Sequence, residues 1–331
     1  MGEVGKLMVG GLVLPSSVTG PAGRRHLPSH EGRRSPQPRI AGMQLHLLDA
    51  TYELFRAFFG APERSAPDGR EVGAVAGLIA STLSLLREPG VTHLAAATDQ
   101  VIESFRNEMF AGYKTGEGVP EVLMQQFPLA ERALEAMGVT VWAMTRFEAD
   151  DALATGAWKY ADDVERVVIL SPDKDFAQCV IRRKVVTYDR RQEIERDEDG
   201  VWEKFGVAPS SIPDYLGLVG DTADGIPGLH GWGAKSTATV LAHYRTIEEI
   251  PDDAERWSVN VRSAARLAQT LAENRDDALL FRELAVLRRD VPLDQSIADL
   301  EWHGVARGPY LELCRELDFD QLAERPQTLQ E

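Results

Sequence analysis

The sequence predicts an α/β protein in which a parallel sheet with helices on both faces is followed by a mostly helical region. Short apolar runs alternate with helical patterns in the first part of the chain. Runs that are apolar throughout are typical of strands buried on both faces, and strand–helix alternation is typical of the crossovers between parallel strands. Nearer the C-terminus, short amphipathic segments broken by Pro and Gly replace this alternation.

The chain is expected to have three parts. Residues 1–42 are rich in Gly, Pro, Ser and Arg without a hydrophobic period, which predicts a disordered extension, and Met43 could be the translational start. Residues 43–200 should hold the sheet and residues 201–331 the helical region. The expected strands are 43–49, 91–98, 139–143, 167–170 and 185–188, and the expected helices of the sheet domain are 123–137, ending before Gly138, and 149–160.

Composition excludes several classes of protein. No apolar run reaches the roughly 18 residues that span a bilayer, and the N-terminus lacks the pattern of a secretory signal. The two cysteines, Cys179 and Cys314, are far apart and have hydrophobic neighbours, so we expect buried free thiols in a reducing cytoplasm. The net charge is −16, which at first argues against a nucleic-acid partner.

Acidic residues are concentrated in five short clusters, each at the expected end of a strand or start of a helix. Alone, Asp49 or Asp99 could simply cap a helix, and carboxylates in a first helical turn often only complement the helix dipole. Without these nine carboxylates the net charge would be −7, so the whole-chain charge is a poor guide to partners. The nine are Asp49, Asp99, Glu148, Asp150, Asp151, Asp173, Asp175, Asp221 and Asp224.

The clusters should meet in one crevice. The carboxyl ends of parallel strands form the functional edge of an open α/β sheet, and Asp49, Asp99 and Asp173 closely follow expected strands. Two like charges about 4 Å apart repel by about 4 kcal/mol at an effective dielectric near 20. A crevice holding so many carboxylates must therefore bind cations, and oxygen ligands suit Mg²⁺ or Mn²⁺.

A glycine-rich segment in the helical region predicts a helix–hairpin–helix motif. Gly228, Gly231 and Gly233 form a Gly-x-x-Gly-x-Gly pattern that leads into Lys235 and Ser236. Glycine lets the backbone approach a phosphate closely, and the N–H groups of a helix N-terminus can then bind it. The same letters would also suit an ordinary glycine turn.

In these motifs the chain resembles the 5′–3′ exonuclease domain of bacterial DNA polymerase I and its flap-endonuclease relatives. The resemblance runs from Met43 to about Leu322 and rests on the order and spacing of five acidic motifs and the hairpin. The matching stretches include Leu48-Asp49 with Arg56, Asp99 with Ser104-Phe105-Arg106-Asn107-Glu108 and Tyr113-Lys114, Glu148-Ala149-Asp150-Asp151, Ser171-Pro172-Asp173-Lys174-Asp175-Phe176, Gly220 to Gly228, and Leu284 to Leu293.

The resemblance implies a PIN-like nuclease core with a helical arch and a helix–hairpin–helix region that grips duplex DNA. Two Mg²⁺ or Mn²⁺ ions would be held by the nine carboxylates, with Arg106 and Lys114 holding the scissile phosphate. Arg56, the hairpin glycines, Lys235 and Ser236 would contact DNA, and K⁺ could bind at the hairpin. No polymerase domain follows, so we expect a stand-alone, monomeric protein of the cytoplasm and nucleoid, active in DNA replication and repair.

Two departures from the family bear on the substrate. Lys114 is followed by the acidic, flexible segment 115–120 where the family has a basic, Pro-rich one, and Ala50 replaces a usual Gly. The arch is therefore expected to hold single-stranded flaps differently or more weakly. The predicted function is a metal-dependent 5′–3′ exonuclease and 5′-flap endonuclease. The alternatives are a catalytically weak DNA-binding protein and a PIN-type ribonuclease.

Overall fold

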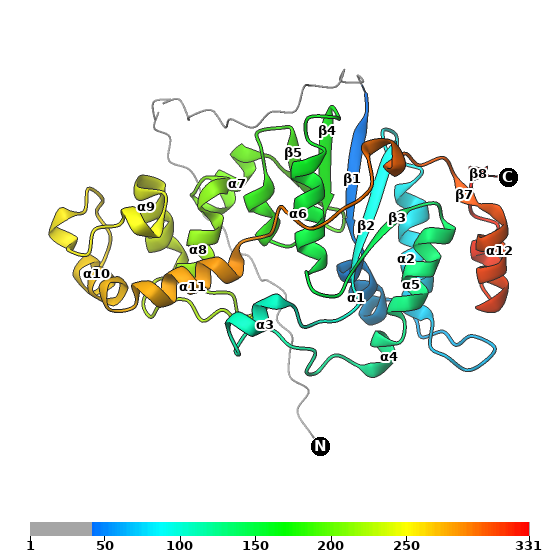
Figure 1. Ribbon diagram of the computed structural model, residues 1–331, viewed down its shortest axis with the longest axis horizontal. Helices are drawn as coiled ribbons and strands as arrows, with labels where there is room; N and C mark the ends of the chain where they lie inside the picture. The colour runs from blue at the N-terminus through cyan, green and yellow to red at the C-terminus, as the bar shows by residue number, and fades with distance from the viewer. Residues whose placement is uncertain (1–41, 331) are drawn as a thin grey trace. The chain divides into compact units, whose positions relative to one another are not determined.

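A six-stranded sheet lies at the centre of the part of the chain that the structure, a computed structural model, describes, residues 42–330 (Figure 1). The disordered extension expected over residues 1–42 falls, except for Gly42, outside the described residues. The strand order is β3-β2-β1-β4-β5-β6. The strands are β1 (Gln44–Asp49), β2 (His93–Asp99), β3 (Thr140–Met144), β4 (Arg166–Leu170), β5 (Val185–Asp189) and β6 (Ile194–Arg196), and a separate pair joins β7 (Val305–Ala306) to β8 (Leu329–Gln330).

The described chain also contains thirteen α-helices. The segments between strands supply the first six, and the region after β6 supplies the others. They are α1 (Ala50–Gly60), α2 (Gly73–Leu85), α3 (Phe105–Met109), α4 (Glu121–Met124), α5 (Phe127–Ala136), α6 (Ala149–Lys159), α7 (Glu198–Phe205), α8 (Ile212–Val219), α9 (Ala234–Tyr244), α10 (Ala264–Glu273), α11 (Arg275–Ala285), α12 (Arg307–Glu316) and α13 (Asp320–Ala323).

The sheet is parallel from β3 to β5, which confirms the predicted fold class. All five expected strands are present within two residues of their predicted limits. The edge strand β6 pairs antiparallel with β5 and was not predicted, because Ile194 is its only apolar residue. A three-residue edge strand has too little hydrophobic patterning to be identified from sequence.

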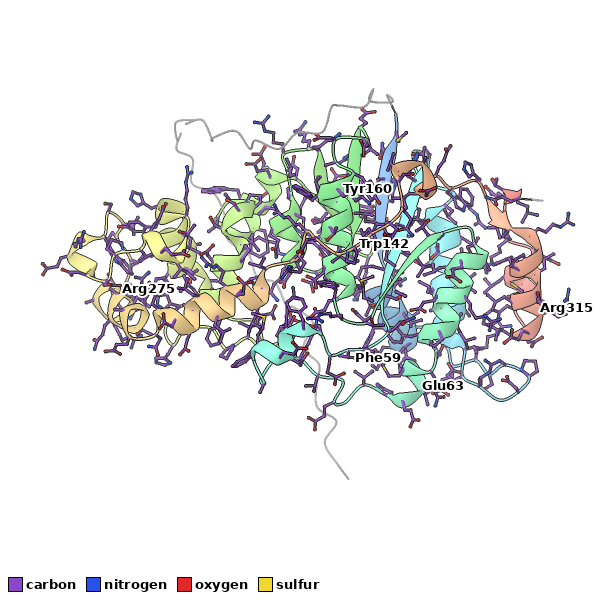
Figure 2. All side chains as sticks on the ribbon, in the orientation of Figure 1. Phe59, Glu63, Trp142, Tyr160, Arg275 and Arg315 are labelled. Carbon is purple, nitrogen blue, oxygen red and sulfur yellow. The ribbon has the colours of Figure 1, made fainter. Side chains whose placement is uncertain are left out.

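Both faces of the sheet are covered, as its apolar strands require. Successive strand residues point to opposite faces, so Leu45 and Leu47 join the core under α6, while Leu48 joins the core formed with α1, α2 and α5. On the α6 side, Trp142 and Tyr160, labelled in Figure 2, both hydrogen-bond to Gln295 of the segment that crosses this face. The core therefore fixes the strand ends, from which the carboxylates extend.

The order of the strands places a topological switch beside β1. From β1 the chain moves outward through β2 and β3, and it then returns to start the other half of the sheet at β4. The first connections of the two halves leave in opposite directions, which opens a crevice at the carboxyl ends of β1 and β4. Asp49 ends β1, and Asp173 follows β4 closely.

The helical region from α7 to α11 has its own core, but the last part of the chain returns to the sheet. Val201, Leu216 and Leu241 belong to the core of the helical region. Leu287 packs under α6, and Leu313 of α12 packs with α5 in the core on the other face. Figure 1 shows α8 to α11 beyond the β5–β6 edge and α12 beyond α5 at the opposite edge. The predicted boundary at 200/201 stays a prediction, and it falls inside α7.

One local expectation was wrong. The helix expected over 123–137 is divided into α4 and α5, since Pro128 begins a new helix at its first turn. After β4 the chain forms no helix at Ser171 and Pro172, and the helical turn η1 (Asp175–Cys179) that follows is a 3₁₀ helix. No helix among residues 42–330 is long and apolar enough to cross a membrane.

Candidate metal centre and nucleic-acid interface

Asp49 both caps a helix and faces the crevice. Its Oδ1 accepts a hydrogen bond from the N–H of Tyr52 at 2.8 Å, which makes it the N-cap of α1. Its Oδ2 accepts one from the hydroxyl of Ser171 at 2.8 Å, across the switch point to the segment after β4. The structural and the functional interpretation of this residue are therefore compatible.

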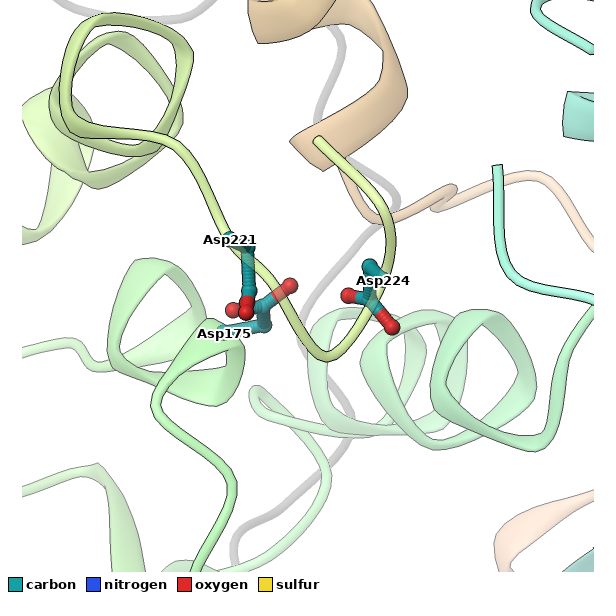
Figure 3. Close-up of side chains that lie close together, drawn as sticks. All are labelled: Asp175, Asp221 and Asp224. Carbon is teal, nitrogen blue, oxygen red and sulfur yellow. The ribbon is translucent and has the colours of Figure 1, made fainter. Parts of the chain in front are cut away.

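Three aspartates from two segments form the one acidic group among the described residues that is close enough together to hold a metal ion. Asp175, Asp221 and Asp224 each offer a carboxylate oxygen, and these oxygens lie within 4.8 Å of one another (Figure 3). Asp175 comes from η1, whereas Asp221 and Asp224 come from the turn after α8. Oδ1 of Asp175 is buried and has no hydrogen-bond partner, which is costly unless a cation occupies the site. This oxygen-only donor set fits a hard divalent metal ion.

The pKa values of three of the crevice carboxyls, Asp49, Asp150 and Asp175, are raised. Burial, reinforced by the negative charges of Asp99 and Asp173, raises the pKa of Asp49 to about 7. Its hydrogen bonds from Tyr52 and Ser171 lower the pKa but do not outweigh this effect. Burial, with Asp49 and Asp173, holds the pKa of Asp150 well above its ordinary value. Burial, with Asp173, Asp224 and Asp221, does the same for Asp175. The sites repel one another across the crevice, which extends beyond the three-aspartate group.

Two lysines offset part of this charge. Nζ of Lys114 lies 2.8 Å from Oε2 of Glu148 and 3.2 Å from Oδ1 of Asp224, and Lys174 pairs with Asp221. Burial disfavours the charged form of Lys114, but the two carboxylates outweigh it and hold its pKa well above the ordinary value. Lys174 was not among the predicted site residues, although its place between Asp173 and Asp175 was a signal for it.

The carboxylate of Glu148 is held by the segment that precedes α5. Its Oε1 accepts a hydrogen bond from Ser104 at 2.6 Å, and its Oε2 accepts one from the hydroxyl of Tyr113 at 3.3 Å. Burial disfavours its charge, but Lys114 and Arg106 outweigh burial and lower the pKa of Glu148. Burial, only partly opposed by the N–H of Ala149, raises the pKa of Asp99.

Arg106 and Asp151 do not lie where the sequence suggested. We expected Arg106 above the metal site and Asp151 among the metal ligands. Instead the two side chains form a buried pair, with exposed fractions of 1% and 0%. Nη1 and Nη2 of Arg106 donate to the two oxygens of Asp151 at 2.8 and 2.7 Å. Both side chains are therefore engaged with each other in the interior, and the phosphate and metal roles expected for them stay predictions.

The arch segment contains little helix. Between β2 and α5 the structure describes only the short helices α3 and α4, and Gly112, Gly116 and Gly118 interrupt the chain between them. Within it, the N–H of Gly116 donates to Oε1 of Glu103 at 3.2 Å. Glu117 is exposed, so the segment after Lys114 presents negative charge.

The hairpin between α8 and α9 requires glycine at position 228 but not at position 233. Gly228 has φ +66°, and a Cβ there would lie 2.4 Å from the backbone nitrogen of Gly220. Gly233 is the N-cap of α9, with its N–H donating to the hydroxyl of Ser236 at 3.3 Å, and it has open space around it. Its neighbour Lys235 is exposed.

Arg266 of α10 is a basic residue that the sequence interpretation missed. A Cβ on Gly231, which has φ +86°, would lie 3.5 Å from a terminal nitrogen of Arg266. Its exposed side chain has no ion-pair partner among residues 42–330. Only the fold brings α10 to the hairpin, and so no local signal could have identified it. The predicted DNA contact Arg56 hydrogen-bonds to Glu53 at 2.5 Å and remains 37% exposed.

Family comparisons match most of the chain. Residues 44–206 match the model of the 5′-3′ exonuclease N-terminal resolvase-like domain, and residues 207–307 match the 5′-3′ exonuclease C-terminal SAM fold. The chain is 31% identical over 258 residues to a 5′-3′ exonuclease of Aquifex aeolicus, covering 78% of this chain and 86% of that one. It is 32% identical over 289 residues to DNA polymerase I of Bacillus caldotenax, covering 86% of this chain but only 32% of the polymerase.

Solved structures with a similar fold are also nucleases by name. The T5 5′-exonuclease with bound zinc has a TM-score of 0.59 at 17% identity, with 85% of this chain and 100% of that chain covered. Flap endonuclease-1 from Methanococcus jannaschii has a TM-score of 0.54 at 16% identity, with 86% and 90% covered. At these identities the similarity supports the PIN-like fold, in agreement with the predicted class.

Proposed function

The chain belongs to the 5′–3′ exonuclease family, and from this membership we propose that it is a metal-dependent 5′–3′ exonuclease and 5′-flap endonuclease of DNA. The membership confirms the resemblance inferred from the acidic motifs. The chain spans about a third of the length of the DNA polymerase I relatives, so their whole activity does not transfer to it.

One observation carries the proposal. Asp175, Asp221 and Asp224 offer oxygens within 4.8 Å of one another, and an oxygen of Asp175 is buried without a partner. The pKa values of Asp49 and Asp150 are raised in the same crevice, beside the carboxyl ends of the strands. Bringing buried carboxylates together is unfavourable without cations, and a cation-filled crevice is suited to binding and cleaving a phosphodiester.

We propose Mg²⁺, or Mn²⁺, as the metal, with two ions in the crevice. Asp175, Asp221, Asp224 and the exposed Asp173 would hold one side, and Asp49, Asp99, Glu148 and Asp150 would hold the other. Bound metal would supply an activated water and neutralise charge on the phosphate. T5 nucleases of the same fold have been solved with divalent metal ions, which supports metal use without identifying the ion here.

Lys114 would position the scissile phosphate, because it is the cation that lies between both groups of carboxylates. It is partly exposed and already lies within ion-pair distance of Glu148 and Asp224. A phosphate entering the crevice would compete with these carboxylates for its N–H donors. Lys114 then contributes a positive charge where negative charge develops on the phosphate during hydrolysis.

DNA is the proposed partner, with the hairpin as its duplex grip. The N–H groups at the start of α9 would bind a phosphate, with Lys235, Ser236 and Arg266 beside it. K⁺ is proposed at the hairpin, where Gly233 leaves the backbone open, and Arg56 is proposed as a further contact. The T5 flap endonuclease has been solved with DNA and metal ions, and that structure shares this fold. We propose a monomer that acts at the nucleoid in the cytoplasm during replication and repair.

A 5′-flap duplex carrying a label at its 5′ end tests the function. The wild type should cut it in Mg²⁺, releasing a short oligomer of the flap, and EDTA should abolish the cut. Asp173→Asn should bind the same DNA with little change and cut it at least about 10²-fold more slowly. Arg315→Gln, on the outer helix α12, is the matched control and should cut at the wild-type rate (Figure 2).

The alternative functions give different results in this assay. A DNA-binding protein without catalysis would shift the flap duplex and leave it intact in both Mg²⁺ and Mn²⁺. A ribonuclease would cut a matched RNA flap faster than the DNA flap. Unchanged cleavage by Asp173→Asn would refute the proposed site, even if DNA remains the substrate.

A further inference from the structure

All three nitrogens of the Arg106 guanidinium contact protein atoms. Besides its two bonds to Asp151, it donates to the carbonyls of Leu284 and Val286 at 2.8 Å each, and its Nη1 lies 3.2 Å from Oε1 of Glu148. A guanidinium carries five N–H donors, and four of those of Arg106 make hydrogen bonds to protein atoms, while the remaining one, on Nη1, lies on a nitrogen within ion-pair distance of Glu148. A phosphate would therefore have to compete with Glu148 or Asp151 for this guanidinium.

The carboxylate of Asp151 is engaged in the same way. Its Oδ1 also accepts from the N–H of Arg288 at 2.9 Å, and its Oδ2 accepts from the N–H of Glu148 at 3.0 Å. Four hydrogen bonds fill the acceptor sites of a carboxylate. Asp175 differs, since one of its buried oxygens has no partner and can bind a cation.

The pair joins three elements that the sequence keeps far apart. Arg106 belongs to α3 of the arch segment, Asp151 to the first turn of α6, and Leu284 to the end of α11. Helix α11 lies against α8, because a Cβ on Gly217 of α8 would be 2.8 Å from the nitrogen of Arg282. Helix α8 leads directly into Asp221 and the hairpin, so the pair connects the arch, Glu148 and the helical region.

We infer that Arg106 and Asp151 are positioning residues of the proposed nuclease, which orient Glu148 and join the arch to α6 and α11. Neither side chain touches the metal ions or the phosphate. In this account Asp151 is not a metal ligand, and Arg106 does not contact the phosphate. This inference rests on the proposed function and concerns the same site.

The chemistry of the two side chains supports this assignment. A planar, bidentate arginine with further carbonyl acceptors holds a fixed geometry that a point charge cannot. The pair contributes little net charge, so it can orient the carboxylate of Glu148 without adding to the potential of the crevice. Removing either partner leaves the other charge buried, and removing Asp151 also leaves the N–H groups of Glu148 and Arg288 without acceptors.

Metal binding tests the role of Asp151 independently of cleavage. Titration with Mn²⁺, followed by calorimetry without DNA, should give Asp151→Asn the wild-type number of bound ions. The affinity of Asp151→Asn for Mn²⁺ should fall by no more than about 10–100-fold, which is typical when a residue that hydrogen-bonds to a metal ligand is replaced. Asp175→Asn is the control for a ligand and should lose one bound ion. Loss of an ion from Asp151→Asn as well would overturn the inference.

Salt dependence tests the role of Arg106. Each phosphate contact contributes about 0.9 to the slope of log affinity against log salt concentration. Arg106→Gln should therefore bind flap DNA in Ca²⁺ with the wild-type slope, while kcat falls and KM stays nearly constant. A slope lower by about 0.9 would show that Arg106 touches phosphate and would overturn the inference.

A double-mutant cycle tests whether the two residues act as a unit. Arg106→Gln with Asp151→Asn should be no slower than the slower single variant, because each change removes the same interaction. If the rate loss of the double variant equals the product of the two single losses, the residues act independently and the inference is overturned.

If a single variant fails to fold, Arg106→Met with Asp151→Leu removes both charges while keeping side-chain volume. The Mn²⁺ stoichiometry of this double variant decides the same question. A wild type that cuts no DNA would refute the proposed function, whereas the Mn²⁺ stoichiometry would still decide the role of Asp151.

Discussion

The side-chain nitrogen of Lys114 lies 2.8 Å from Oε2 of Glu148. The lysine comes from the arch segment and the glutamate from the start of α6, so the contact joins the arch to the acidic crevice. The backbone N–H of Lys114 also donates to the carbonyl of Asp224 at 2.9 Å. A single cation thus stands between both groups of proposed metal ligands.

Replacing Lys114 with Gln should destabilise the metal-free protein. Asp224 would lose its counter-charge and Glu148 would keep only Arg106, at a cost of about 1–3 kcal/mol in the free energy of unfolding. Mg²⁺ should then raise Tm more than in the wild type, because the ion replaces the missing charge. Thermal unfolding in EDTA and in Mg²⁺ measures both effects, with Lys114→Arg as the control that keeps the charge. A smaller Mg²⁺ gain in Lys114→Gln would contradict this account.

Stability without metal should fall as pH rises. The pKa of Asp49 is raised from 3.8 to about 7, so between these values the folded protein holds a proton that the unfolded chain has released. This stabilisation is complete below the unfolded pKa and is lost as pH rises through the folded pKa. Mg²⁺ binds the ionised carboxylates and releases protons, so its gain in Tm should grow from about pH 5 to about pH 8.

Melting curves in EDTA and in Mg²⁺ across this pH range measure both trends. Calorimetry of Mg²⁺ binding in two buffers with different ionisation enthalpies counts the released protons. A Tm in EDTA that rises through this pH range would refute the raised pKa of Asp49 as a source of stability. An increase of Tm with Mg²⁺ that does not depend on pH would refute metal binding by the ionised carboxylates.

Gly225 should tolerate no side chain. It has φ +72°, and a Cβ there would lie 2.2 Å from the carbonyl oxygen of Gly112, beside Lys114. Gly225→Ala should therefore displace the arch from the turn that carries Asp224, lowering stability and slowing cleavage. Gly118 has φ +86°, and a Cβ there would have nothing within 4 Å, so Gly118→Ala carries the backbone strain alone. Urea unfolding should show a loss larger by about 1–3 kcal/mol for Gly225→Ala, and equal losses would contradict the contact.

Two basic residues beside the hairpin should each contribute one phosphate contact. Lys235→Ala and Arg266→Ala should each weaken duplex DNA binding and lower the salt slope by about 0.9. Fluorescence anisotropy at several salt concentrations measures both quantities. Arg315→Ala on α12 removes the same type of charge far from α10 in the structure and should leave the slope unchanged (Figure 2). If all three variants give the same slope, the hairpin is not the duplex grip.

The buried pair should also be visible in stability. Asp151→Ala removes the bidentate partner of the buried Arg106 guanidinium and leaves only Glu148 as its counter-charge, which should cost about 3–5 kcal/mol in the free energy of unfolding. Asp290→Ala breaks a pair with Arg288 whose two side chains are 64% and 38% exposed, and such surface pairs contribute about 0–1 kcal/mol. Urea unfolding of both variants makes the comparison. Similar losses would mean that solvent screens the Arg106 pair.

Sequence reasoning located the strands well and the helices less well. The five parallel strands are apolar, and their ends are marked by residues such as Asp49 and Asp99. The antiparallel edge strand β6 and the division between α4 and α5 depend on few residues and on packing, so the hydrophobic period does not reveal them. The return of α12 to the first core involves contacts between residues far apart in sequence.

The neighbours Asp150 and Asp151 show how far the sequence alone can assign residues to the site. Both stand in one acidic cluster, and the sequence treats them alike. Successive residues of a helix point about 100° apart, so only one of them can face the crevice. Asp150 shares the field of Asp49 and Asp173, whereas Asp151 is enclosed by Arg106. Arg266 shows the converse, because no motif includes it and only the position of α10 brings it to Gly231.

By itself the sequence determined the parallel α/β class, the family and the edge of the sheet where the carboxylates gather. Those features follow from strand periodicity and from motif order, which are properties of short segments. Only the tertiary structure decided which carboxylates have unpaired oxygens and which cations pair with the others. It also decided that Arg106 is buried in an ion pair with Asp151. These outcomes depend on burial and on partners distant in the chain, since the same side chain binds a metal or an arginine according to what the fold places beside it.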